Sequence, residues 1–166
     1  TLISMVYGPR LGTQFHRRIE LAKMPQDWKM FPAYLRGAGY YTTNNSKKDY
    51  NAVETKGTWD ASSNQAHWRN RPAGKPFFHV QTYTDSHESS LHFKQGWVDS
   101  PDNQTDPGSI ELAPYHPDTP VFRLTYARYH DRIKSIDNRV GKLVEQLESD
   151  GELENTFIFY FGDHGG

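Results

Sequence analysis

Hydrophobic residues near the end of the chain follow a helical period. Between Thr119 and Gly151 they recur at alternating spacings of four and three residues, which keeps them on one face of an α-helix. Thr119-Pro120 suits the start of this helix and Gly151 its end. The apolar face comprises Phe122, Tyr126, Tyr129, Ile133, Ile136, Val140, Leu143 and Leu147. We expect the opposite face to be a solvated surface; it carries Arg128, Asp131, Lys134, Lys142, Glu145 and Glu148.

Three short runs rich in aromatic and β-branched residues predict strands at 40–43, 77–83 and 157–161. A shorter helix is predicted from Asp27, as N-cap, to Gly39, with Pro32 in its first turns. The long helix leads into the run 157–161 after a short connection, which is half of a βαβ crossover. The predicted fold class is therefore α/β, with a central β-sheet flanked by helices.

Two long stretches show no clear period. Residues 51–74 are dense in Asn, Ser, Trp, His and Arg, and residues 89–120 contain five prolines. Long loops inside a compact domain are usually binding elements. By position and polarity, the part from Trp59 to Arg71 and the loop 89–120 are candidates for substrate recognition.

The composition excludes several classes of partner. The 166 residues carry a formal net charge of −1, which argues against nucleic-acid binding. No apolar stretch approaches the roughly 20 residues that a membrane-spanning helix needs. The absence of cysteine excludes disulfides and thiol chemistry within these residues. We expect a small or polymeric polar molecule as the partner, and oligomeric state cannot be predicted.

Candidate functional residues follow two of the predicted strands. Asp163 and His164 follow the run 157–161 after one glycine, and His87 lies in a polar cluster after the run 77–83. Ligands of α/β sheets gather beyond the carboxyl ends of the strands. The plainer interpretation is that Asp163 caps a turn and that His87 is a structural histidine. We expect five further histidines to be structural or surface residues, with His79 packed within its strand: His67, His79, His92, His116 and His130.

Several segments together resemble the sulfatase family of the alkaline-phosphatase superfamily. Leu153–Thr156, the apolar run and Asp163-His164-Gly165 resemble the family's passage of (D/E)NT, strand and DHG. The segment Gly39–Asn51 resembles the one that places the catalytic lysine in sulfatases. Further matching segments occur in the same order along the chain, the last three like one subgroup of bacterial sulfatases: Leu11–Gln14, Trp59-Asp60, Ala66–Pro72 and Lys75–Phe78.

The resemblance implies metal-dependent hydrolysis of a sulfate ester, on a small molecule or a glycan. By this resemblance, Asp163 is expected to be a metal ligand and His164 to occupy the neighbouring ligand position. Lys47 is expected to contact the sulfate group, and His87 to bind sulfate or protonate the leaving oxygen. A divalent cation, a lysine and a histidine suit this chemistry, because charge on the sulfate oxygens must be neutralised and the departing alcohol needs an acid. The metal is expected to be Ca²⁺, ahead of Zn²⁺ or Mg²⁺.

Some family features are missing from this sequence. Sulfatases form a formylglycine nucleophile from Cys or Ser in a C/S-x-P-x-R motif, and no such motif is present. We expect the motif just before Thr1. Residues 1–166 are then only part of a sulfatase catalytic domain, and we expect them to be inactive alone. Asp49 stands where many sulfatases have a histidine, and it receives no role. The resemblance also suggests a periplasmic or secreted protein.

Two other functions remain open. One is a phosphodiesterase or phosphatase of the same superfamily that uses two zinc ions, since His164 is a more natural ligand for Zn²⁺ than for Ca²⁺. The other is a non-catalytic binding protein that keeps the fold. Without the family pattern, Lys47 could be an ordinary solvated loop lysine.

Overall fold

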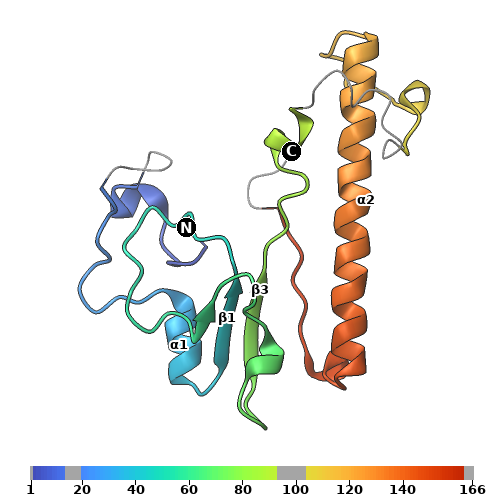
Figure 1. Ribbon diagram of the computed structural model, residues 1–166. Coiled ribbons are helices and arrows are strands. Elements are labelled where there is room, and N and C mark those ends of the chain that lie inside the picture. Colours follow the sequence, from blue (N-terminus) through green and yellow to red (C-terminus); the bar gives the residue numbers. More distant parts are fainter. Residues whose placement is uncertain (1, 14–19, 93–103, 163–166) are drawn as a thin grey trace. The chain divides into compact units, whose positions relative to one another are not determined.

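The computed structural model describes residues 2–13, 20–92 and 104–162 (Figure 1). The chain forms two compact units, Thr1–Thr82 and Tyr83–Gly166. The first unit contains a small β-sheet and the second a long helix. Among the described residues, no helix has both the length and the apolar character needed to cross a bilayer.

The first unit is built around a parallel sheet in the order β2-β1-β3. Its strands are β1 (Tyr41–Asn45), β2 (Ala61–Ser62) and β3 (Phe77–Gln81). In register, Thr43 of β1 lies opposite Ala61 on one side and His79 on the other. The predicted strands at 40–43 and 77–83 are confirmed with small shifts of their ends, as is the α/β class. β2 was not predicted, because a two-residue strand of Ala and Ser has no apolar run.

The central strand β1 is buried although its residues are polar. Thr42, Thr43 and Asn44 are at most 1% exposed. Each has a hydrogen-bond partner, as buried polar groups require: the Thr42 hydroxyl donates to the Thr58 carbonyl at 3.2 Å, and Thr43 Oγ1 lies 2.8 Å from His79 Nδ1. The strand is therefore held by side-chain hydrogen bonds as well as by its backbone ladder.

Helix α1 (Phe31–Gly37) packs beside β1 and is shorter than predicted. The expected N-cap, Asp27, lies in a turn with φ of +65° and is outside the helix. The reason is Pro32, which has no backbone N–H and is best accommodated in a first helical turn. The predicted stop is confirmed, since Gly39 has φ of +97°, a conformation that favours glycine.

The second unit contains helix α2 (Pro120–Ser149), as predicted. The Thr119 hydroxyl accepts a hydrogen bond from the Phe122 backbone N–H at 3.4 Å, and Gly151 follows the helix with φ of +71°. One expectation about its charged face is wrong. Arg128 is only 5% exposed, and its Nε donates to the Ser90 carbonyl at 2.9 Å. The connection 83–92 covers this arginine, which the helical period alone could not show.

The run 157–161 is not a buried strand among the described residues. It is drawn as an unpaired trace in Figure 1, and Phe157 and Phe159 are 90% and 82% exposed. A strand needs a neighbour for its backbone N–H and C=O groups. In the described part of the second unit, 83–92 and 104–162, no other strand exists to provide one. The prediction of a buried strand therefore fails here for lack of a partner.

Candidate functional site

Lys47 lies just beyond the carboxyl end of β1, in a turn that hydrogen bonds from neighbouring side chains hold in place. The side-chain amide of Asn44 donates to the Lys47 carbonyl at 3.3 Å and to Ser62 Oγ at 3.0 Å. The Asn45 carbonyl accepts from the Thr82 backbone N–H at 2.8 Å. The turn is thus tied to the last residue of β2 and to the residue that follows β3, at the edge of the sheet where α/β proteins hold ligands.

A second set of contacts anchors the same turn to residues 62–66. The Asn45 amide donates to the Asn64 carbonyl at 3.0 Å and to the Ala66 carbonyl at 3.3 Å. The Ser46 hydroxyl donates to Asn64 Oδ1 at 2.5 Å. Part of the irregular stretch 51–74, expected as a recognition surface, therefore supports the lysine turn.

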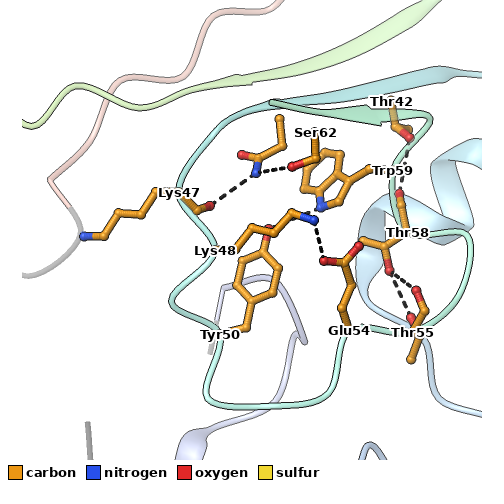
Figure 2. A network of polar contacts seen from close by, with 10 residues as sticks. Thr42, Lys47, Lys48, Tyr50, Glu54, Thr55, Thr58, Trp59 and Ser62 are labelled. Atoms are coloured by element: carbon orange, nitrogen blue, oxygen red, sulfur yellow. Dashed lines mark hydrogen bonds and ion pairs between the residues drawn. The ribbon is translucent and has the colours of Figure 1, made fainter. Parts of the chain in front are cut away.

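The side chain of Lys47 points away from the network that holds its neighbours (Figure 2). It is 35% exposed, and its Nζ lies 3.9 Å from Asp49 Oδ2, near the limit of an ion pair. Lys48 differs, because its Nζ lies 2.8 Å from Glu54 Oε2. A partly exposed ammonium at the carboxyl end of a parallel strand can contact the oxygens of an anion.

Lys48 belongs to a structural network. Figure 2 shows its amino group directed to Glu54, close to Tyr50 and Trp59. The Trp59 indole N–H donates to the Tyr50 hydroxyl at 3.2 Å. Burial raises the pKa of Tyr50, so this hydroxyl stays neutral and can accept the bond. Two adjacent lysines thus have different environments.

His87 is the first residue after the turn that follows β3 and caps the short helix Glu88–Leu91. Its Nδ1 accepts the backbone N–H of Ser89 at 3.2 Å and lies 2.9 Å from the Ser89 hydroxyl. Because Nδ1 accepts, the proton of the neutral ring is on Nε2. The ring is exposed. His87 can therefore present an N–H donor to a ligand while Ser89 fixes its orientation.

The structure places Lys47 in the first unit and His87 in the second. Asp163 and His164, the predicted metal ligands, lie outside the described residues. Across 2–13, 20–92 and 104–162, no group of three His, Cys, Asp or Glu side chains could hold a metal ion. The predicted assembly of all four residues stays a prediction.

His79 packs within β3 as expected. Burial is the main cause that lowers its pKa, to about 4, and the nearby ring of His67 acts in the same direction. The hydrogen bond with Gln81 opposes this shift. His79 is thus neutral at physiological pH and serves the sheet. His116 also has a structural contact, since its Nδ1 lies 2.6 Å from the Tyr126 hydroxyl.

Sequence reasoning missed the residues that hold the lysine turn. Asn44 and Asn45 received no role, although both donate side-chain hydrogen bonds around Lys47. Asp60 was also missed; burial alone would raise its pKa, but hydrogen bonds from Thr42 and Arg36 outweigh burial and lower it. A pair of asparagines at the end of a strand was the one available signal, because Asn tends to bond nearby backbone groups.

The sequence matches the sulfatase family over residues 29–166, and the chain belongs to that family. It is 36% identical to an ulvan-active sulfatase of Formosa agariphila, over 86% of this chain and 29% of that protein. An arylsulfatase of Hemicentrotus pulcherrimus is 34% identical over 39% of this chain and 13% of its own length. An N-acetylglucosamine-6-sulfatase of Capra hircus is 58% identical over 19% of this chain and 6% of its own length. No solved structure gives a significant match. The chain thus spans under a third of the length of each of these relatives.

Proposed function

We propose that the full-length gene product hydrolyses sulfate esters. The observation that carries this proposal is the position of Lys47, in a turn pinned by Asn44 and Asn45 at the carboxyl edge of a parallel sheet, in a chain of the sulfatase family. A cation held there can neutralise charge on the non-bridging oxygens of a sulfate group. The sulfatase names of the relatives support the same reaction.

His87 supplies the second role. Breaking the sulfate ester releases an alcohol, whose oxygen needs a proton. His87 is an exposed residue, and the bonds to Ser89 set the direction of its ring. In the proposed mechanism His87 binds the sulfate group or donates this proton. The nucleophile is a formylglycine outside residues 1–166.

A divalent metal completes the proposed site. The sulfatase family is generally metal-dependent, and we assign Asp163 as a ligand with His164 in the neighbouring ligand position. The carboxylate suits Ca²⁺ or Mg²⁺, and the imidazole suits Zn²⁺. Ca²⁺ is the proposed metal, and it would neutralise charge on the sulfate group. Replacing Asp163 by Ala should lower the metal content of the purified protein, measured by plasma emission spectrometry, whereas His87→Ala should leave it unchanged.

The proposal extends to the whole protein. The three-stranded sheet is part of an alkaline-phosphatase-like central sheet flanked by helices. The substrate is a sulfated glycan, which the names of the ulvan-active and N-acetylglucosamine-6-sulfatase relatives support. The protein is periplasmic or secreted, and cell fractionation with antibody detection tests this location.

The function is tested by comparing two adjacent lysines in the full-length gene product. Lys47→Ala should reduce kcat/KM for an aryl sulfate by at least about 100-fold, the usual effect of removing one charge-stabilising donor. Lys48→Ala is the matched control, because Lys48 is paired with Glu54 and is similarly exposed. It should change kcat/KM by less than about threefold.

The outcomes separate the candidate functions. Equal losses in the two variants would remove Lys47 from the site. Faster turnover of an aryl phosphate than of the sulfate by the unaltered protein would favour the phosphatase. No turnover of either ester, with retained glycan binding, would favour the non-catalytic binding protein.

A further inference from the structure

A groove along α2 gathers positive charge, and neither Lys47 nor His87 is among its lining residues. Its volume is about 370 Å³, and all of its lining residues belong to the second unit. Five of them are cations, and Asp131 is the single acid among the described residues that line it. The cationic lining consists of Arg128, Arg132, Lys134, Arg139 and Lys142. The remaining lining is polar: Gln104, Ser135 and Asn138.

The positive charge of the groove does not result from a high net positive charge of the whole chain. The whole chain has a net charge of −1, and the other acids of α2, Asp137, Glu145 and Glu148, are not in the lining. Charge of one sign on one helix face, with acids elsewhere on the same helix, focuses a positive potential on the groove. The groove therefore attracts anions.

The acids next to the groove cancel only part of this charge. Lys134 Nζ lies 4.0 Å from Asp131 Oδ1, the limit of an ion pair. Asp131 accepts hydrogen bonds from Gln104 N and from Thr105 N and Oγ1, at 3.0, 3.4 and 2.6 Å. Burial acts to raise its pKa, but these bonds outweigh burial and lower it, so the carboxylate is ionised and occupied in holding the loop. Asp85 pairs with Arg139 at 2.5 Å. Even with Asp85 counted, the two carboxylates offset two of the five cationic charges, and the groove keeps a net positive charge.

The spacing of the cations indicates an extended ligand. Arg128 is buried, so the row of accessible cations runs from Arg132 to Lys142, over which the helix rises about 15 Å at about 1.5 Å per residue. One sulfate or phosphate ion cannot contact cations spread over that length, whereas a polymer with repeated anionic groups can. We propose that this α2 groove binds sulfate groups of an extended sulfated glycan, apart from the ester that is hydrolysed. The choice of a sulfated polymer over another polyanion rests on the proposed function.

Arg132 and Lys142 offer the sharpest test. Both residues are changed to Gln in the full-length gene product. This double change removes two positive charges from the lining of the groove. The matched control is Lys23→Gln with Lys56→Gln, two exposed cations of the first unit. Dextran sulfate is the probe and uncharged dextran the blank, with binding measured by calorimetry at several salt concentrations. Thermal melting checks that the variants fold.

The groove variant should bind dextran sulfate at least about tenfold more weakly, and its slope of log K against log salt should fall by about two, one for each lost contact. The control should match the unaltered protein. Equal affinities for groove variant and control would overturn the proposal. Tighter binding of duplex DNA than of dextran sulfate would overturn the assignment to a sulfated glycan.

Binding to the polymer does not require turnover. Suppose that the full-length protein hydrolyses no sulfate ester while the groove variant loses affinity for dextran sulfate. The proposed function is then wrong, and glycan binding in the α2 groove is supported. If hydrolysis is found and the groove variant binds dextran sulfate as the control does, glycan binding in the groove is refuted and the proposed function is supported.

Discussion

Polar residues in the first unit are stabilised by specific partners rather than by exposure to water. Thr42, Thr43 and Asn44 are buried in the central strand, and each forms a side-chain hydrogen bond with a residue distant in the sequence. An unpaired buried polar group costs about 1–3 kcal/mol, so these bonds restrict which residues can occupy β1. Asn44 also donates a hydrogen bond to the Lys47 carbonyl and so helps to fix the position of that residue.

His79 should make stability depend on pH. Its pKa in the folded chain is about 4, below its ordinary value of 6.5, because burial disfavours the charged ring. Between these values the unfolded chain binds a proton that the folded chain does not. Stability is therefore fully present above pH 6.5, falls as pH decreases through that window, and loses up to about 3 kcal/mol near pH 4.

Thermal unfolding of the full-length gene product between pH 4 and 8 measures this dependence. His79→Gln, which keeps a polar side chain without a titrating ring, should flatten the curve between pH 4 and 6.5. His92→Gln, at an exposed histidine, is the control and should leave the curve unchanged. An unaltered slope in His79→Gln would show that another group is responsible.

At the scale of elements, local signals set the ends of the helices and packing set their faces. Pro32 requires a place in the first turn, so α1 begins at Phe31 and not directly after the predicted N-cap, Asp27. For α2, Thr119 and Gly151 mark the ends that the sequence predicts, but Arg128 is buried against the segment 83–92. A helical period identifies faces, and only the neighbouring segment decides which charged side chain it covers.

The cap of α2 provides a paired test. Thr119→Ala removes the acceptor for the Phe122 N–H and should lower the free energy of unfolding by about 1 kcal/mol. Thr125→Ala, inside the same helix, removes a hydroxyl that bonds back to the Val121 carbonyl, and it should be neutral or slightly stabilising. Urea denaturation followed by circular dichroism compares the two. Equal losses would mean that Thr119 does not act as a cap.

At the scale of the whole molecule, the run 157–161 exposes a large apolar surface. Its five consecutive apolar residues are each at least 47% exposed. Contiguous exposed apolar patches and unpaired strands favour association with another surface. We expect the 166-residue chain alone to bind the dye ANS and to aggregate.

A double change, Phe157→Ser with Phe159→Ser, should reduce ANS fluorescence and light scattering of the 166-residue chain. Tyr7→Ser with Tyr115→Ser is the matched control, because both tyrosines are 79% exposed but lie far apart in the sequence. The control should change neither signal appreciably. A monomeric, cooperatively folding chain that binds no dye would contradict this prediction and would favour the non-catalytic binding protein.

The sequence by itself determined the elements whose signals are local. The helix 120–149 follows from eight apolar residues at alternating spacings, and β1 and β3 follow from short runs of aromatic and β-branched residues. The family followed from motifs in a fixed order, and the match over 29–166 confirms it. Lys47 and His87 were also named from sequence, because motif position and strand ends are local properties; their roles stay predictions.

Only the tertiary structure decided what depends on contacts between distant residues. The pinning of the Lys47 turn by Asn44 and Asn45 depends on segments about 20 residues away, and β2 exists only because β1 offers a backbone to pair with. The exposure of the run 157–161 and the burial of Arg128 depend on which segment lies next to them. Local propensity acts on neighbouring residues in the sequence. These contacts join distant residues, and they form only when the fold closes the long loops between them.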